Sequence, residues 1–193
     1  IIEKAGAKID LFRRIAAIND STAIFASNTS SLSISEIAEG VPHPERVCGM
    51  HFFNPAQVMK LVEVVEGQIT APWVTEKITA LAASMGKTPV TCRDSPGFIV
   101  NRVARHFYLE SLELLREGVA EVETIDSILE ASGFKMGPFR LMDLIGNDIN
   151  LAVTQSLYEA CGKPARFRPS EIQQGKVKNG ELGRKTGKGY YNY

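Results

Sequence analysis

The pattern of hydrophobic residues changes near residue 95. Up to Cys92, helical stripes alternate with short apolar runs rich in β-branched residues, an order typical of a sheet covered by helices. The turn-forming sequence Ser95-Pro96-Gly97 follows, and every later segment has a helical pattern. We therefore predict an α/β domain over residues 1–94 and an all-α domain over residues 95–193.

Individual elements follow from periodicity and from capping residues. In the first part, strands are expected over residues 22–27, 46–52, 61–65 and 88–92, and helices over 3–18, 33–38 and 74–85. In the second part, helices are expected over 98–116, 122–131, 138–158 and 170–177. Val100, Val103, Phe107 and Leu114 are expected on one apolar face of the first of these. The glycine-rich end is expected to be irregular, with Tyr190 and Tyr191 packed on the body.

Composition excludes several classes of function. Lys plus Arg equals Asp plus Glu at 22 each, so the formal charge is zero and nothing indicates a nucleic-acid partner or an anionic membrane surface. The apolar runs are too short to cross a membrane. Cys48, Cys92 and Cys161 are few, odd in number and far apart, so neither a metal site nor a disulfide framework is expected. We expect a reducing compartment, the cytoplasm or the mitochondrial matrix.

His51 is the histidine best placed for chemistry. It ends an expected strand, and ligands of open α/β sheets bind beyond strand ends. Glu63 lies inside another apolar strand, where a carboxylate is costly to bury unless it is paired. Bonded to one ring nitrogen of His51, it would fix the tautomer and leave the other nitrogen to accept a proton. Both residues also admit a purely structural interpretation, and His43 and His106 are expected to be a solvated turn residue and a partly buried helix residue.

Two further polar positions are candidates. Ser30 lies in the turn 27–31 after a buried strand, where serine is most often a turn or cap residue. A hydrolase triad of Ser30, His51 and Glu63 is a weaker alternative, because the Gly-x-Ser-x-Gly motif is missing. Asn101 is a poor helix former early in a long helix. It is either solvent-facing or a hydrogen-bond donor to a ligand.

Several longer motifs resemble the 3-hydroxyacyl-CoA dehydrogenase family. They are Ser27-Asn28-Thr29-Ser30-Ser31-Leu32, His51-Phe52-Phe53-Asn54-Pro55, Met59-Lys60-Leu61-Val62-Glu63-Val64, Asp94-Ser95-Pro96-Gly97-Phe98-Ile99-Val100-Asn101-Arg102, Met136-Gly137-Pro138-Phe139 and Gly183-Arg184-Lys185-Thr186-Gly187-Lys188-Gly189-Tyr190-Tyr191. The resemblance covers the whole chain, in the family's order. It implies part of a Rossmann-type NAD-binding domain, then an α-helical domain for dimerisation and substrate binding.

The resemblance also implies roles for single residues. His51 would be the general base and Glu63 its orienting carboxylate. Ser30 and Asn101 would bind the oxygens of a (3S)-3-hydroxyacyl-CoA, and the cofactor, NAD, would contact Ser30 and Asn54. Glu3 and Lys8 match further NAD-contacting positions by spacing, although residues 4–7 depart from the usual pattern. A homodimer formed through the helical domain is implied as well.

The family's Gly-x-Gly-x-x-Gly turn does not occur in this sequence, and the chain begins Ile1-Ile2-Glu3, like the end of a buried strand. We expect a truncated chain that binds NAD weakly and has little activity alone, since that glycine-rich turn holds the pyrophosphate. A non-catalytic member of the same fold family, or an inactive fragment, is the main alternative. A hydroxyacid dehydrogenase with a lysine base is disfavoured by the presence of His51 and Glu63.

Overall fold

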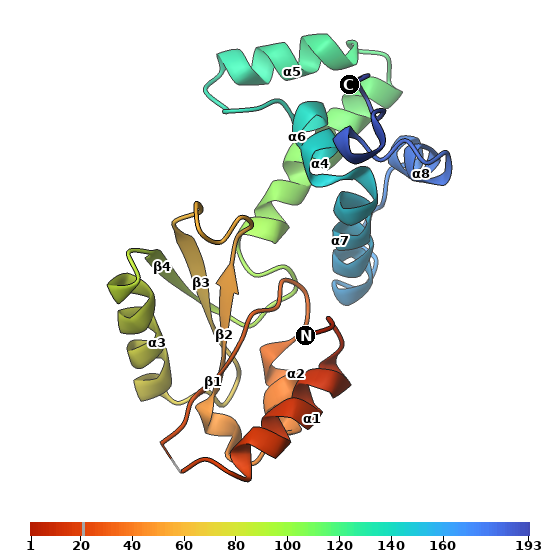
Figure 1. Cartoon of the computed structure of the whole chain (residues 1–193). Helices are drawn as coiled ribbons and strands as arrows, with labels where there is room; N and C mark the ends of the chain where they lie inside the picture. The colour runs from red at the N-terminus through yellow and green to blue at the C-terminus, as the bar shows by residue number, and fades with distance from the viewer. Residues whose placement is uncertain (21) are drawn as a thin grey trace. The chain divides into compact units, whose positions relative to one another are not determined.

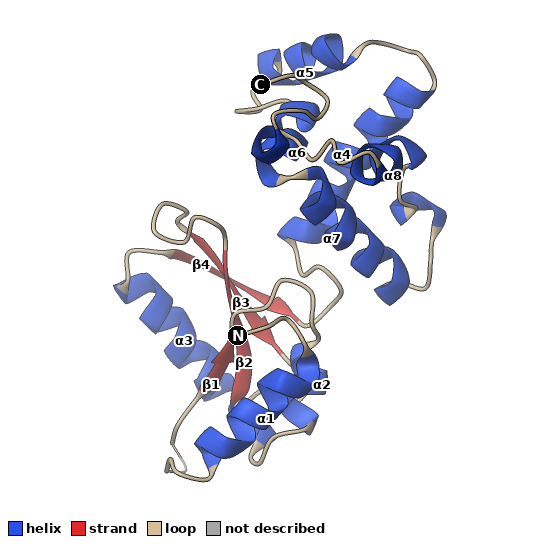
Figure 2. Cartoon of the chain, turned by 45° about the vertical axis from the view of Figure 1, so that its right-hand side comes forward, coloured by secondary structure: helices blue, strands red, loops and turns tan. Residues whose placement is uncertain are grey.

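A computed structural model of the chain describes residues 1–20 and 22–193. The chain divides into two compact units, Ile1–Ile99 and Val100–Tyr193. Strands occur in the first and only helices in the second, apart from isolated bridges in the tail (Figure 2). The fold class expected from the sequence, an α/β part followed by an all-α part, is confirmed.

The sheet of the first unit has four strands in the order β1-β2-β3-β4. Their bounds are β1 Phe25–Ser27, β2 Val47–Phe52, β3 Leu61–Glu66 and β4 Thr88–Arg93. β1 runs parallel to β2, β2 antiparallel to β3, and β3 parallel to β4. The antiparallel step reflects the short connection between β2 and β3, which leaves no room for a crossover helix. All four expected strands are present, the first beginning three residues later than expected.

Helices cover both faces of this sheet (Figure 1). α1 (Ala5–Ala16) and α2 (Ile34–Glu39) share one hydrophobic cluster with Val47 and Val65, whereas α3 (Pro72–Ser84) shares another with Cys48 and Val64. Neighbouring residues of a strand thus point to opposite faces, as the two-residue repeat of a strand requires. By the same alternation, His51 and Glu63 belong to the face that carries α1 and α2.

Local signals explain where these helices begin and end. Ser33 accepts a hydrogen bond from the Glu36 backbone N–H at 3.2 Å and so caps α2, as expected. α3 ends just before Gly86, whose φ of 73° suits glycine. α1 begins at Ala5 rather than Glu3, because Lys4 has an extended backbone.

The second unit is built from five α-helices among the described residues. They are α4 Val100–Arg116, α5 Val122–Ala131, α6 Pro138–Ile145, α7 Asn147–Ala160 and α8 Glu171–Lys178. Tyr108 and Leu112 of α4 pack with Ile125, Phe139 and Met142 in its core. Within the described residues, none of the helices is both long and apolar enough to cross a membrane.

Two expectations about these helices were wrong. The single helix over 138–158 is two helices, because Gly146 adopts a φ of 103° that ends α6 and starts α7. The apolar face expected for α4 was partly wrong: Phe107 and Leu114 pack against the core as expected, but Val103 does not. Val103 is 67% exposed, while the buried face includes Tyr108, Leu112 and the charged Arg105.

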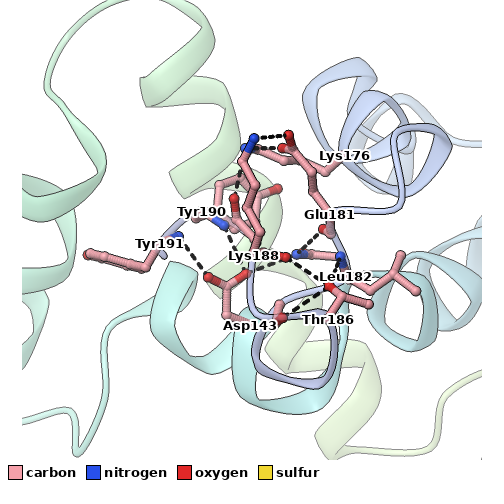
Figure 3. A network of polar contacts seen from close by, with 11 residues as sticks. Asp143, Lys176, Glu181, Leu182, Thr186, Lys188, Tyr190 and Tyr191 are labelled. Carbon is pink, nitrogen blue, oxygen red and sulfur yellow. Dashed lines mark hydrogen bonds and ion pairs between the residues drawn. The ribbon is translucent and has the colours of Figure 1, made fainter. Parts of the chain in front are cut away.

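The chain end packs on this unit, as expected, through a buried carboxylate (Figure 3). Asp143 is 1% exposed and accepts hydrogen bonds from the backbone N–H groups of Tyr190 (3.0 Å) and Tyr191 (2.9 Å). The Tyr193 hydroxyl and the Asn147 amide donate to it as well. Since a buried carboxylate needs such donors, Asp143 fixes the path of the last four residues.

Candidate functional site

The strongest candidate for chemistry is a buried imidazole–carboxylate pair. His51 of β2 lies directly opposite Glu63 of β3 in the antiparallel register. Directly opposite residues point to the same face, so their side chains meet. His51 Nδ1 lies 2.7 Å from Glu63 Oε2, and the two side chains are 6% and 1% exposed. This geometry makes Nδ1 the donor to a carboxylate and leaves Nε2 as the nitrogen that can exchange a proton.

The second oxygen of Glu63 is held by the backbone. The Ile99 N–H donates to Glu63 Oε1 at 3.0 Å. This N–H is presented by the turn after Ser95, in which Phe98 has a φ of 48°. An aromatic residue at positive φ is strained, and the packing of Phe98 in the core compensates for it. The carboxylate therefore has a fixed orientation, in which Oε2 accepts a hydrogen bond from the His51 ring and Oε1 accepts one from the Ile99 backbone.

Two aromatic rings confine the imidazole. The Phe53 ring centroid lies 4.6 Å from that of His51, and the Phe98 centroid lies 5.7 Å away in an edge-on arrangement. They limit rotation of the ring and lower the local polarity, which strengthens its bond to Glu63. Sequence reasoning missed Phe53, Phe98 and Ile99 as supports of the pair, although the Pro-Gly turn before Phe98 marked an irregular backbone.

A second polar cluster joins the start of the chain to the turn after β1. Lys8 is 4% exposed, and its Nζ lies 2.9 Å from Glu3 Oε2 and 3.3 Å from the Asn28 carbonyl oxygen. Glu3 Oε1 accepts hydrogen bonds from the Thr29 hydroxyl and, at 3.3 Å, from the Ser30 N–H. Glu3, Lys8 and Ser30, all expected at the site, are thus brought together. Thr29 is a member that sequence reasoning missed.

The negative charge of the Glu3 carboxylate is stabilised by its neighbours in this cluster. Partial burial disfavours ionisation of Glu3, but the hydrogen bond from Thr29 and the Lys8 ammonium outweigh it, so the pKa of the Glu3 carboxyl lies below its ordinary value. Asn28 connects the cluster to β2, because its Oδ1 accepts from the Phe52 N–H at 3.1 Å. The residue after Phe52 is Phe53, which contacts His51. The two clusters therefore share the carboxyl ends of β1 and β2.

The remaining expected site residues are Asn54 and Asn101. Asn54 is exposed in the loop after β2 and precedes a cis peptide bond to Pro55. Asn101 is the second residue of α4 and belongs to the other unit. His43 is exposed beside Glu45, as expected, whereas His106 is exposed rather than partly buried.

Comparison with known protein families assigns both units. Residues 1–95 match the family model for the 3-hydroxyacyl-CoA dehydrogenase NAD binding domain. Residues 97–193 match the model for the C-terminal domain of the same family. Together they account for nearly the whole chain.

Individual relatives agree. The chain is 48% identical to a 3-hydroxyadipyl-CoA dehydrogenase from Escherichia coli K12 over its whole length, covering 42% of that protein. It is 38% identical to the mitochondrial hydroxyacyl-coenzyme A dehydrogenase of Sus scrofa, covering all of the chain and 62% of that protein. A crystal structure of a 3-hydroxybutyryl-CoA dehydrogenase from E. coli K12 superposes on 99% of the chain and 41% of its own, with a TM-score of 0.97 and 49% identity.

The chain thus spans about half the length of these relatives. Both halves of its sequence match the same family in the family's own order, and its fold matches a solved member. The chain belongs to the 3-hydroxyacyl-CoA dehydrogenase family.

Proposed function

We propose that this chain carries the general base of an NAD-dependent dehydrogenase that oxidises (3S)-3-hydroxyacyl-CoA to 3-oxoacyl-CoA. One observation carries the proposal: the buried pair of His51 and Glu63, joined at 2.7 Å, with the second carboxylate oxygen held by the Ile99 N–H. A histidine whose Nδ1 is fixed by a carboxylate is a typical general base at neutral pH.

In this reaction His51 Nε2 takes the proton of the 3-hydroxyl group as the carbon–oxygen bond becomes a carbonyl. The ring then carries a positive charge, which the Glu63 carboxylate stabilises at Nδ1. Because Glu63 already accepts a hydrogen bond from the Ile99 N–H, the carboxylate need not reorient as that charge develops. Such preorganised electrostatics is commonly the largest contribution of a protein to catalysis.

The other site residues position the reactants. Ser30 and Asn101 are proposed to hydrogen-bond the substrate oxygens and so hold C3 in a reactive orientation. Bound NAD would supply the acceptor for the hydride that leaves C3. Ser30, Asn54, Glu3 and Lys8 are proposed to hold it. The ion pair of Glu3 and Lys8 beside the carboxyl ends of β1 and β2 fits this group, since nucleotides bind at such strand ends.

The substrate range, the assembly and the location are also proposals. The relatives are named for hydroxyadipyl, hydroxybutyryl and general hydroxyacyl thioesters, so we propose a role in fatty-acid or related CoA-thioester metabolism. We propose a homodimer formed through the helical unit. The free cysteines favour a reducing compartment, which would be the cytoplasm or the mitochondrial matrix.

The test is substitution of the base in the intact protein. His51→Gln should remove most turnover of acetoacetyl-CoA with NADH, by about 10³-fold or more, while both compounds still bind. His43→Gln is the matched control, because the side chain of His43 is 61% exposed. Turnover by His51→Gln close to that of the unmodified protein would refute the proposal. The proposal would also be refuted if the unmodified protein bound the thioester without turning it over, which is the behaviour expected of a non-catalytic member of the family.

A further inference from the structure

Arg105 is a buried charge that the proposed reaction does not use. It lies on α4, is 3% exposed, and reaches across to α7. Its Nη1 donates to the Asn150 carbonyl oxygen and to Thr154 Oγ1, both at 3.1 Å, and its Nε donates to the Asn101 carbonyl oxygen at 3.1 Å. The guanidinium is thus held firmly in one orientation by neutral oxygens.

What this guanidinium lacks is a counter-ion. None of the ion pairs among the described residues includes Arg105, and its aromatic partner is the face of the Tyr108 ring, 4.8 Å away. Burial accordingly lowers the pKa of Arg105 from its ordinary value. Buried arginines are normally paired with an anion, so an unpaired one indicates that the anion comes from elsewhere.

One nitrogen of the group is available for that anion. Nη2 donates no hydrogen bond to any described residue. The residue is 3% exposed as a whole, and Nη2 is not among the fully enclosed unpaired side-chain atoms of the described residues, which include Arg46 Nε and Tyr190 Oη. Arginine binds carboxylates strongly through such N–H groups. The free nitrogen and the missing counter-ion therefore point to the same kind of ligand.

We propose that Arg105 binds the terminal carboxylate of a dicarboxylic 3-hydroxyacyl-CoA. The inference rests on the function proposed above, in which Asn101 contacts an oxygen of the reacting part of the substrate. Asn101 and Arg105 are four residues apart, so they lie on the same face of α4, and Arg105 Nε lies 3.1 Å from the Asn101 carbonyl oxygen. In a six-carbon dicarboxylic chain, the terminal carboxylate lies about 4–5 Å beyond C3, with carbon–carbon bonds of about 1.5 Å. A substrate whose C3 lies beside the Asn101 side chain would therefore bring this carboxylate within reach of the neighbouring guanidinium.

Arg105 would then select for the class of substrate rather than take part in the chemistry. A chain that ends in a methyl group would leave the guanidinium without its anion, which disfavours its binding. A dicarboxylic chain would restore the pair. The reacting carbon, the base and the cofactor are the same for both kinds of substrate. A difference in binding between them would therefore arise at the end of the acyl chain that is remote from the thioester.

The experiment compares two thioesters of equal length in the intact protein. 3-Hydroxyadipyl-CoA and 3-hydroxyhexanoyl-CoA differ only in the carboxylate or methyl group at C6. The natural protein should prefer the first in kcat/KM by at least tenfold. Arg105→Gln should lower kcat/KM for the first by about 10- to 100-fold, the usual range for a lost hydrogen bond to a charged group. For the second the change should be under threefold. Arg116→Gln, on the same helix but exposed and paired with Glu113, is the matched control and should change neither value.

Three results would overturn the inference. One is an equal loss for both thioesters on Arg105→Gln, which is the signature of a purely structural residue. Another is a natural protein without preference for the carboxylate. If Arg105→Gln does not fold, the natural protein decides: equal kcat/KM for 3-hydroxyadipyl-CoA and its C6 amide would exclude charge recognition. Failure to oxidise either thioester would instead refute the proposed function, and with it this inference.

Discussion

Replacing Glu63 with glutamine separates the orienting role of this carboxylate from its role in packing. The substitution keeps shape and volume in a position that is 1% exposed. It leaves one acceptor and one donor where the carboxylate has two acceptors. Two partners of the carboxylate, His51 Nδ1 and the Ile99 N–H, cannot then both donate a hydrogen bond to it as they do now.

The two orientations of the new amide have different consequences. If its oxygen faces the ring, its NH2 group meets the Ile99 N–H, and two donors oppose each other in the interior at a cost of about 1–3 kcal/mol. If its oxygen stays with Ile99, its NH2 group faces His51 Nδ1. The neutral ring can accept this bond by carrying its proton on Nε2. We expect the second orientation, because it gives both the Ile99 N–H and His51 Nδ1 a hydrogen-bond partner.

That orientation places the proton on the nitrogen that should accept one. By analogy with catalytic histidines held in the wrong tautomer, Glu63→Gln should lower kcat by about 10³- to 10⁴-fold. This corresponds to about 4–5.5 kcal/mol of transition-state stabilisation. KM should change little, since Glu63 is not proposed to touch the substrate.

The assay is steady-state turnover of acetoacetyl-CoA with NADH by the intact protein, together with thermal unfolding. Glu66→Gln, at the end of the same strand, is the control and should retain its activity. A kcat for Glu63→Gln within tenfold of the natural value, in a folded protein, would refute the orienting role.

Two further predictions concern stability and reactivity. Asp143→Asn should destabilise the helical unit by about 3 kcal/mol, because at least one buried donor among Tyr190 and Tyr191 loses its acceptor. In calorimetry this lowers the Tm of a domain of this size by roughly 12–24 °C. Asp148→Asn, which removes an exposed ion pair of about 0–1 kcal/mol, should shift it by under about 8 °C. Equal shifts would contradict the role given to Asp143. Burial raises the pKa of the Cys48 thiol to about 12, so iodoacetamide at pH 8 should leave Cys48 unmodified until the protein unfolds, as peptide mass spectrometry would detect. Rapid labelling of Cys48 in the folded state would contradict its burial.

Much of the first unit is predictable from the sequence, since apolar runs with strong patterns occupy buried strands. The pairing of His51 with Glu63 was expected because both polar residues interrupt such runs, and the short segment between them permits only a return strand. The sequence does not reveal the Ile99 N–H as a ligand of Glu63. That contact depends on the positive φ of Phe98, which a pattern of side chains does not encode.

The helical unit shows two other limits. The break at Gly146 was missed because the apolar pattern continues across it, and a single glycine costs a helix only about 1 kcal/mol. Arg105 was missed for a different reason. Periodicity assigns charged residues to the solvated face, and a buried guanidinium breaks that rule. Residues that depart from the rules of local sequence are those for which tertiary contacts or function must supply the reason.

The most direct test of the central claim is the protonation of one ring. In protein labelled with ¹⁵N at histidine, nuclear magnetic resonance distinguishes the two nitrogens of His51, and His51→Gln identifies its signals. The neutral ring should carry its proton on Nδ1, bonded to Glu63, with Nε2 unprotonated. A neutral ring protonated on Nε2, with no hydrogen bond from Nδ1, would contradict it.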